Sequence, residues 1–110
     1  MSMRETLQGM IDKFHTKIEN DEKVREEVEP IFKTLNIDLK DETYSLVLDH
    51  GKIRDFKDGL LDEADITLMT TPEYLQALID GELRPMRAYM TGKIKIKGKI
   101  QDVMHLKKLF

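Results

Sequence analysis

The chain has 110 residues, of which 40% are hydrophobic and 35% charged, a balance that fits one globular domain and excludes a disordered chain. The absence of cysteine excludes disulfides, thiolate catalysis and cysteine-based metal sites, and the net charge of −3 argues against a nucleic-acid-binding protein. No stretch approaches the roughly 18 apolar residues of a membrane span, and the first residues lack a signal core. We therefore expect a cytoplasmic protein with a single domain over residues 1–110.

The N-terminal part of the chain predicts two helices. From residue 2 to residue 19, apolar residues recur with a helical period, at Leu7, Met10, Ile11, Phe14 and Ile18. Ser2 and Glu5 have the spacing of a capping box, in which each side chain accepts a hydrogen bond from the backbone of the other. A second, highly charged helix is expected near residues 21–29, ending before Pro30.

After Pro30 the apolar residues alternate with polar ones, which predicts half-buried strands. Strands are expected near residues 35–39, 44–48, 52–56 and 65–70. His50 and Gly51 form a plausible two-residue hairpin connection between the second and third of these, because glycine adopts a positive φ without strain.

The last third of the chain predicts three helices and one strand. Thr71 and Pro72 are a strong helix start, and Gly81 suits the residue that ends that helix. Pro85 opens a short helix that Gly92 closes, a strand follows over residues 93–97, and a final helix runs over residues 100–110.

These elements predict an α/β (α+β) fold with the order α-α-β-β-β-β-α-α-β-α. We expect a mixed five-stranded sheet with helices packed on one face. The first four strands are expected to form an antiparallel meander, and the fifth, which follows a helical crossover, to lie parallel to its neighbour.

The polar residues give little support for catalysis or for a metal site. His15, His50 and His105 lie far apart in the sequence, and no second histidine follows any of them at helical spacing. Neither Ser2 nor Ser45 lies in a nucleophile turn, and no glycine-rich phosphate loop is present. The acidic segment fails the calcium-loop pattern and is interpreted as a solvated loop; it contains Asp55, Asp58, Asp62, Glu63 and Asp65. We therefore expect no enzyme activity, no cofactor and no metal.

Four lysines alternate with other residues near the C-terminus, at Lys93, Lys95, Lys97 and Lys99, and the period of two places them on one face of a strand. One interpretation is a basic stripe that attracts anionic lipid headgroups. The alternative, which we favour, is a charged outer face or an edge strand protected against further pairing.

Apolar residues between positions 66 and 110 are rich in methionine, which suits surfaces that accept variable apolar shapes. The set includes Met69, Met86, Met90 and Met104 together with several leucines. On pattern alone it is more typical of a packed core than of a pocket, and composition does not distinguish a filled core from one with a cavity.

The C-terminal half carries a family signature. The segments Asp65-Ile66-Thr67-Leu68, Thr71-Pro72-Glu73-Tyr74-Leu75 and 81–98, with a glycine, an apolar Ala-Tyr-Met run and then Gly-Lys-Ile-Lys-Ile-Lys-Gly, resemble the sterol carrier protein type 2 domain (SCP-2 sterol-binding domain). The final helix, ending at residues 107–110, is similar too. The chain thus looks like a stand-alone, prokaryotic-type member of that family.

The resemblance implies non-catalytic binding, and possible transfer, of a fatty acid, acyl chain or isoprenoid in a hydrophobic tunnel between the sheet and the helices. A dimerisation or accessory scaffold module for a lipid- or quinone-modifying enzyme is the alternative. The expected partners are a lipid-like ligand, a membrane surface contacted transiently and a second copy of the chain, but not nucleic acid. Mapped onto this chain, the resemblance implies a tunnel wall made of Ile66, Leu68, Leu75, Leu78, Ile79, Leu83, Met86, Met90, Ile94, Val103, Met104 and Leu106.

Overall fold

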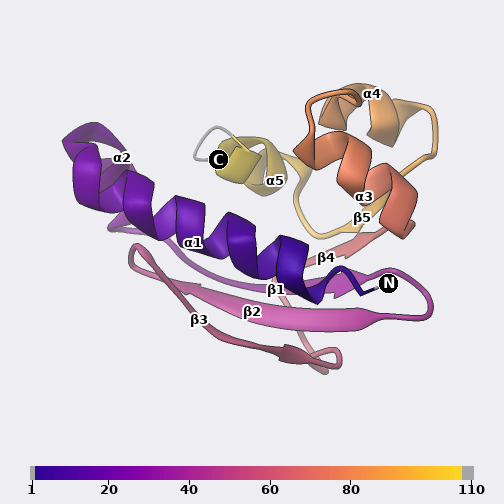
Figure 1. Ribbon diagram of the computed structural model, residues 1–110, viewed down its shortest axis with the longest axis horizontal. Helices are drawn as coiled ribbons and strands as arrows, with labels where there is room; N and C mark the ends of the chain where they lie inside the picture. The colour runs from indigo at the N-terminus through magenta and orange to yellow at the C-terminus, as the bar shows by residue number, and fades with distance from the viewer. Residues whose placement is uncertain (1, 108–110) are drawn as a thin grey trace.

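The computed structural model describes residues 2–107, with side chains up to residue 105, and its elements follow the predicted order (Figure 1). The final helix was expected to reach Phe110, and residues 108–110 lie outside the described part of the chain. None of the helices within residues 2–107 has the length and apolar character that crossing a membrane requires. The elements are α1 (Arg4–Asn20), α2 (Glu22–Val28), β1 (Phe32–Asp38), β2 (Thr43–Asp49), β3 (Lys52–Asp58), β4 (Ile66–Met69), α3 (Pro72–Ile79), α4 (Pro85–Met90), β5 (Lys95–Lys97) and α5 (Ile100–Lys107).

The predicted fold class is confirmed: the described strands form one mixed sheet, in the order β3-β2-β1-β4-β5, with helices on one face. Two details of the predicted topology are wrong. The meander comprises β1, β2 and β3, whereas β4 pairs with β1 and runs parallel to it. Strand β5 is antiparallel to β4. Alternation within a strand reports which face is buried, but it does not identify the neighbouring strand, and this is why the topology was missed.

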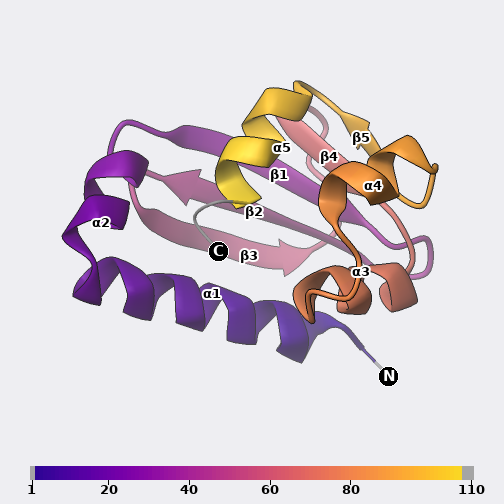
Figure 2. The ribbon, with the colours of Figure 1, turned by 90° about the horizontal axis from the view of Figure 1, so that it is seen from above.

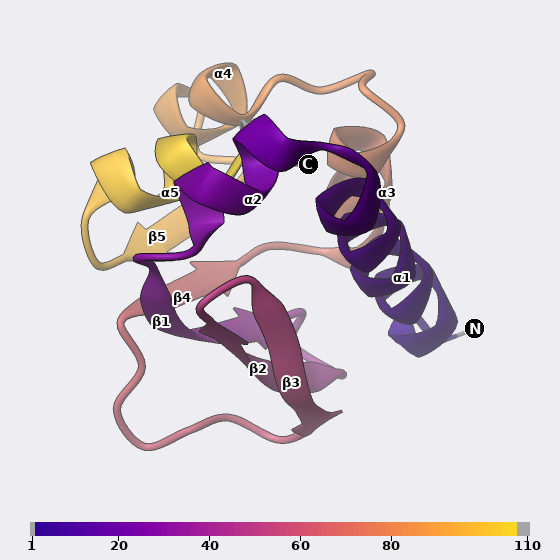
Figure 3. The ribbon, with the colours of Figure 1, turned by 90° about the vertical axis from the view of Figure 1, so that its left-hand side faces the viewer.

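The connection between β3 and β4 explains the parallel pairing. Residues 59–65 pass under the sheet on the side away from the helices (Figure 3). The buried side chain of Asn36 holds this connection by accepting from the N–H of Leu61 at 2.8 Å and donating to its carbonyl at 3.0 Å. The Asp65 carboxylate accepts from the N–H and hydroxyl of Thr34. The outer sheet face is therefore covered by a loop, and Asp65 has a structural role.

Strand β5 is antiparallel to β4 because the chain enters β5 beside the end of β4 that it left. Helices α3 and α4 together return the chain to the end of β4, so that Lys95 pairs with Met69 and Lys97 with Thr67. The strand is shorter than the expected residues 93–97. The N–H groups of Lys93 and Ile94 both donate to the carbonyl of Ala88, which places these two residues in the connection.

The helix starts differ in how well the sequence predicted them. Thr71 caps α3 as expected, since its hydroxyl accepts from the N–H of Tyr74. The capping box at the start of α1 is wrong. The N-cap is Met3, its N–H donates to the Glu42 carboxylate at 2.8 Å, and Ser2 accepts from the N–H of Arg4. Glu42, in the connection between β1 and β2, takes the place that Glu5 was predicted to have. This is a tertiary contact, which the spacing of neighbouring residues does not predict.

The hairpin between β2 and β3 is confirmed. His50 and Gly51 have φ angles of 48° and 93°, and positive values at both central residues are typical of the turn that matches strand twist.

The helices form two groups over the inner sheet face. Helix α1 lies along the β2–β3 side with α3 beside its N-terminal end, and α4 and α5 lie on the β1–β4–β5 side (Figure 2). The buried side of α1 presents Leu7, Ile11 and Phe14 to the core. The second group of helices positions the candidate site.

Candidate functional site

One row of side chains crosses the inner sheet face and shows where the core is incomplete. Strand pairing aligns Tyr44, Ile37, Leu68 and Ile96 on β2, β1, β4 and β5. Tyr44 and Ile37 are 4% and 7% exposed, whereas Leu68 and Ile96 are only half-buried. The apolar surface of the inner face therefore becomes more accessible toward β5.

The same asymmetry appears in the whole core. Among the described residues, the buried core cluster draws almost entirely on the chain before residue 60, with Ile66 and Leu75 as its members beyond that point. The later apolar side chains that pack against it are only partly buried, namely Leu68, Ile79, Ile96 and Val103. Apolar side chains under α1 are buried. The helices on the β1–β4–β5 side leave part of the apolar surface below them accessible.

Helix α5 is fixed over the inner face by a polar contact and an apolar one. Lys33 points to this face, since it shares the register of Leu35 and Ile37. Its ammonium group lies 3.1 Å from the Asp102 carboxylate on α5. Val103, the next residue, packs against the core. The C-terminal helix thus covers the half of the sheet where Leu68 and Ile96 are accessible.

Helix α4 and its connection to β5 are fixed to the end of β4. Ala88 is fully buried, and its carbonyl accepts from two N–H groups of the connection. The Thr70 hydroxyl donates to the Lys93 carbonyl at 2.9 Å. Ile94 is 2% exposed beside this anchor. These bonds hold α4 in place although its outer surface is exposed.

The structure places the twelve predicted wall residues in three environments. Ile66, Leu75 and Ile94 are buried. Met86 and Met90 are 44% and 77% exposed. The half-buried members are Leu68, Leu78, Ile79, Leu83, Val103 and Met104, and the side chain of Leu106 lies outside the described part.

Of the predicted wall residues, the structure brings Leu68, Ile79 and Val103 together against the same core cluster. The prediction omitted Ile96, although it alternates with Ile94 in the sequence and its register with Leu68 places it in the cross-strand row. That the set lines a tunnel stays a prediction.

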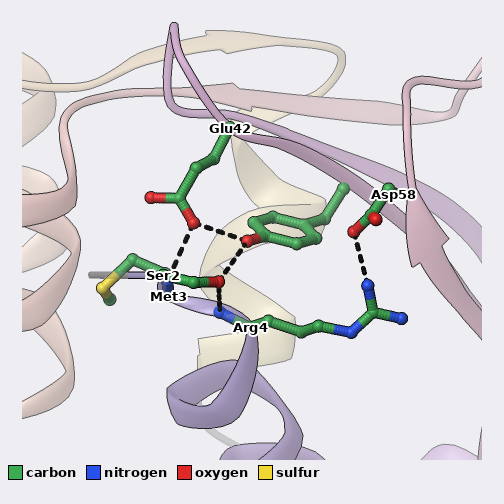
Figure 4. A network of polar contacts seen from close by, with 6 residues as sticks. Ser2, Met3, Arg4, Glu42 and Asp58 are labelled. Atoms are coloured by element: carbon green, nitrogen blue, oxygen red, sulfur yellow. Dashed lines mark hydrogen bonds and ion pairs between the residues drawn. The ribbon is translucent and has the colours of Figure 1, made fainter.

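A surface depression of about 780 Å³ lies at the start of α1 and is lined mainly by polar side chains. None of the predicted wall residues whose side chains the structure describes lines it. Its side chains bind one another: the Tyr44 hydroxyl donates to the Glu42 carboxylate at 2.5 Å, and Arg4 lies 2.7 Å from Asp58 (Figure 4). The Ser2 and Tyr44 hydroxyls are 3.1 Å apart. This network attaches α1 to the sheet.

Hydrogen bonds in this network shift two pKa values in opposite directions. The Tyr44 hydroxyl, followed by the Met3 N–H, lowers the pKa of Glu42 by hydrogen bonding to its ionised form. Burial raises the pKa of Tyr44, and the hydrogen bond that its hydroxyl donates to the Glu42 carboxylate raises it further. Both shifts preserve the arrangement of an ionised Glu42 beside a neutral Tyr44.

Glu42→Gln is expected to destabilise the fold at neutral pH but not in acid. A lowered folded pKa means that the carboxylate stabilises the fold above its ordinary pKa of about 4.3, and that this contribution is lost as the pH falls through the folded value. We expect a loss of about 1 kcal/mol at pH 7, or about 4–8 °C in Tm. Thermal unfolding followed by circular dichroism between pH 7 and pH 3 would test this. A difference from the wild type that is constant with pH would contradict it. The control is Glu5→Gln, at an exposed position in the first turn of α1.

Two of the histidines considered for catalysis make hydrogen bonds to the backbone. His15 accepts from the N–H of Ile53 at 3.0 Å, and the ring of His50 lies 2.7 Å from the Glu29 carbonyl. The Ser45 hydroxyl is fully buried and has no hydrogen-bond partner among the described residues. In residues 2–107, no group of three or more histidine or acidic side chains is arranged to hold a metal ion.

The four C-terminal lysines are all exposed, but they do not form one strand face as predicted. Lys95 and Lys97 share a face of β5, whereas Lys93 and Lys99 lie outside the strand. Strand β5 is an edge of the sheet. Its position agrees with the favoured interpretation, in which the lysines protect an edge strand against further pairing.

Comparison with known proteins identifies relatives of this chain. Residues 11–110 match the SCP-2 sterol transfer family. A 42-residue stretch is 45% identical to stomatin-like protein 1 of Mus musculus, and it covers 38% of this chain and 10% of that protein. A 38-residue stretch is 40% identical to a fatty acid-binding protein of Yarrowia lipolytica, and it covers 34% of this chain and 30% of that protein. The chain thus spans well under two thirds of these relatives.

Among solved structures, that of the UbiJ-SCP2 ubiquinone synthesis protein aligns with a TM-score of 0.73. The alignment covers 97% of this chain and 91% of that one, at 18% identity. At this identity the likeness shows a shared fold.

Proposed function

The chain belongs to the SCP-2 sterol transfer family, and we propose that it binds and transfers a lipid-like apolar molecule without acting on it chemically. The ligand is a fatty acid, an acyl chain or an isoprenoid. It lies in a tunnel between the inner sheet face and α3, α4 and α5. The walls are the predicted apolar residues together with Ile96.

The observation that carries this proposal is the loss of burial along the cross-strand row from Tyr44 to Ile96. Apolar side chains that face a helix layer but stay half-buried offer surface to a ligand, and a bound chain would remove that surface from water. Leu68 and Ile96 supply the floor, and Ile79 and Val103 approach from α3 and α5.

The energetics suit pick-up and delivery. A 16-carbon chain gains about 0.8 kcal/mol per buried methylene, or about 13 kcal/mol in all. Association costs of about 4–15 kcal/mol leave an affinity of roughly micromolar strength. An empty tunnel of about 300 Å³ would cost about 7 kcal/mol, a large share of the stability of a small domain, so the occupied state is favoured.

The polar groups support a role without catalysis. The two serines are engaged or inaccessible: Ser2 contacts Tyr44 and Arg4, and Ser45 is fully buried. His15 and His50 hydrogen-bond to backbone groups. None of these contacts joins a nucleophile to a base, as acyl transfer or ester hydrolysis would require.

Titration with a fluorescent long-chain fatty acid would test the proposal, with native mass spectrometry of the purified protein as a second readout. We expect saturable uptake in the micromolar range and a co-purified apolar molecule. The absence of both would contradict the proposal.

A second candidate is a dimerisation or accessory module, favoured by the surface of α4. Met86, Tyr89 and Met90 are 44%, 42% and 77% exposed on this one short helix. Such a patch suits a second protein surface. Sedimentation velocity would distinguish the candidates. A tight dimer that dissociates in the Met90→Glu variant favours the module. A monomer with saturable fatty-acid uptake favours the carrier.

A further inference from the structure

A second surface depression, of about 460 Å³, lies at the end of the sheet and away from the proposed tunnel. Strands β1 and β4 run parallel, so their carboxyl ends, at Asp38 and Met69, meet side by side here. Helix α3 begins directly after β4 at the same end. The β1–β2 turn, the start of α3 and strand β5 therefore all border this depression.

The depression is cationic although the chain as a whole is acidic. Lys40 contributes from the β1–β2 turn, Lys93 from the α4–β5 connection and Lys95 from β5. Asp38 is the carboxylate among the described lining residues, so three positive charges and one negative charge leave +2, against −3 for the whole chain. The Asp38 carboxylate already accepts from the N–H of Lys40 at 2.9 Å.

Lys40 is held in a backbone conformation that a side chain disfavours. Its φ is 73°, and the N–H of Asp41 donates to the Leu39 carbonyl across it at 3.0 Å, so that Lys40 is the central residue of a three-residue turn. A glycine would adopt this φ without strain. Non-glycine residues with such angles cluster at functional sites.

The opposite rim is also positioned by the fold. The Lys93 carbonyl accepts from Thr70 and the Lys93 N–H donates to Ala88, so its backbone is fixed on both sides. The Lys93 ammonium lies 5.8 Å from the centre of the Tyr74 ring. The N-terminal end of α3, capped by Thr71, adds the partial positive charge of a helix start.

We propose that this depression binds the phosphate group of a phosphate-bearing ligand. Lysine ammonium groups bind phosphate as point charges, and three of them line this depression. The local charge of +2 matches the charge of about −1.5 to −2 on a phosphomonoester. A soluble phosphate compound and a phospholipid headgroup share this chemistry. The proposal does not depend on the tunnel, because none of the predicted wall residues with a described side chain lines the depression.

Titration of the ¹⁵N-labelled protein with inorganic phosphate, followed by NMR, tests the site. We expect saturable shifts of the amides of Lys40, Thr71 and Lys93, with at least a five-fold weaker affinity in Lys93→Gln. Lys97→Gln and Lys99→Gln, which remove the same charge outside the depression, should bind as the wild type does. Shifts that do not saturate, or equal losses in the control variants, would overturn the proposal.

Lys40→Gly separates binding from folding. It removes the charge and the disfavoured φ together, so we expect affinity for phosphate to fall at least five-fold with no loss in Tm. Retained affinity in this variant would overturn the proposal. Fatty-acid uptake should be unchanged in both Lys40→Gly and Lys93→Gln, which keeps this test separate from that of the tunnel.

Sedimentation with vesicles identifies the source of the phosphate. Binding to phosphatidylcholine vesicles that contain phosphatidic acid, and not to phosphatidylcholine alone, supports a lipid headgroup if Lys93→Gln abolishes it. Phosphate shifts without vesicle binding support a soluble phosphate compound. The absence of both responses overturns the proposal.

Discussion

Met104→Glu is expected to weaken the uptake of a fluorescent fatty acid about 100-fold while the fold is retained. Met104 is half-buried on α5, the helix that Lys33 and Asp102 hold over the accessible half of the inner face. Glutamate keeps both methylenes but replaces the apolar S–CH3 end with a carboxylate, which loses apolar contact and adds a desolvation cost, about 3 kcal/mol together. Each 1.4 kcal/mol corresponds to a factor of ten in affinity.

The control for this variant is Gln101→Glu, which adds the same charge to the exposed side of the same helix. It should take up the fatty acid as the wild type does. Circular dichroism and thermal unfolding of Met104→Glu verify the fold, which a half-buried position tolerates. Unchanged uptake in a folded Met104→Glu protein would place the ligand elsewhere and contradict the proposed tunnel.

The sequence predicted the elements better than their arrangement. Thr71 and Pro72 begin α3 as expected, because a capping hydroxyl and a proline act through bonds within a few residues. Strand order has no such local determinant. The parallel pairing of β1 and β4 depends on Asn36 and Asp65, which hold the crossover loop through contacts between residues some 25 to 31 positions apart.

The candidate site could be predicted only in part, for a related reason. Alternation placed Leu68 and Ile94 in strands. Leu68 does lie in β4, where its burial depends on how the helices pack over it, whereas Ile94 lies in the connection before β5. The cationic depression was not anticipated. Lys40 and Lys93 are separated by more than fifty residues, and the unusual φ of Lys40 has no signature in the sequence.

Gly98→Ala is expected to destabilise the fold by about 3 kcal/mol, a large share of the roughly 5–15 kcal/mol available to a small domain. Gly98 has a φ of 113°, and a Cβ atom there would lie 2.4 Å from the carbonyl oxygen of Asp65. Asp65 does not move aside easily, because its N–H and carboxylate are both bonded to Thr34. The clash would separate β5 from the start of β4.

Two other glycines make this prediction specific. Gly92 has a φ of 78° and nothing within 4 Å of an added Cβ, so Gly92→Ala should cost only about 1 kcal/mol of backbone strain. Gly9 lies inside α1 with the same free space, and Gly9→Ala should stabilise the fold by about 0.5–1 kcal/mol. Urea unfolding of the three variants should therefore rank them as Gly9→Ala, Gly92→Ala and Gly98→Ala in decreasing stability. If Gly98→Ala were as stable as Gly92→Ala, the close approach of the two backbones would be wrong. The position of α5, which begins two residues after Gly98 and covers the proposed tunnel, would then lose its anchor in the sheet.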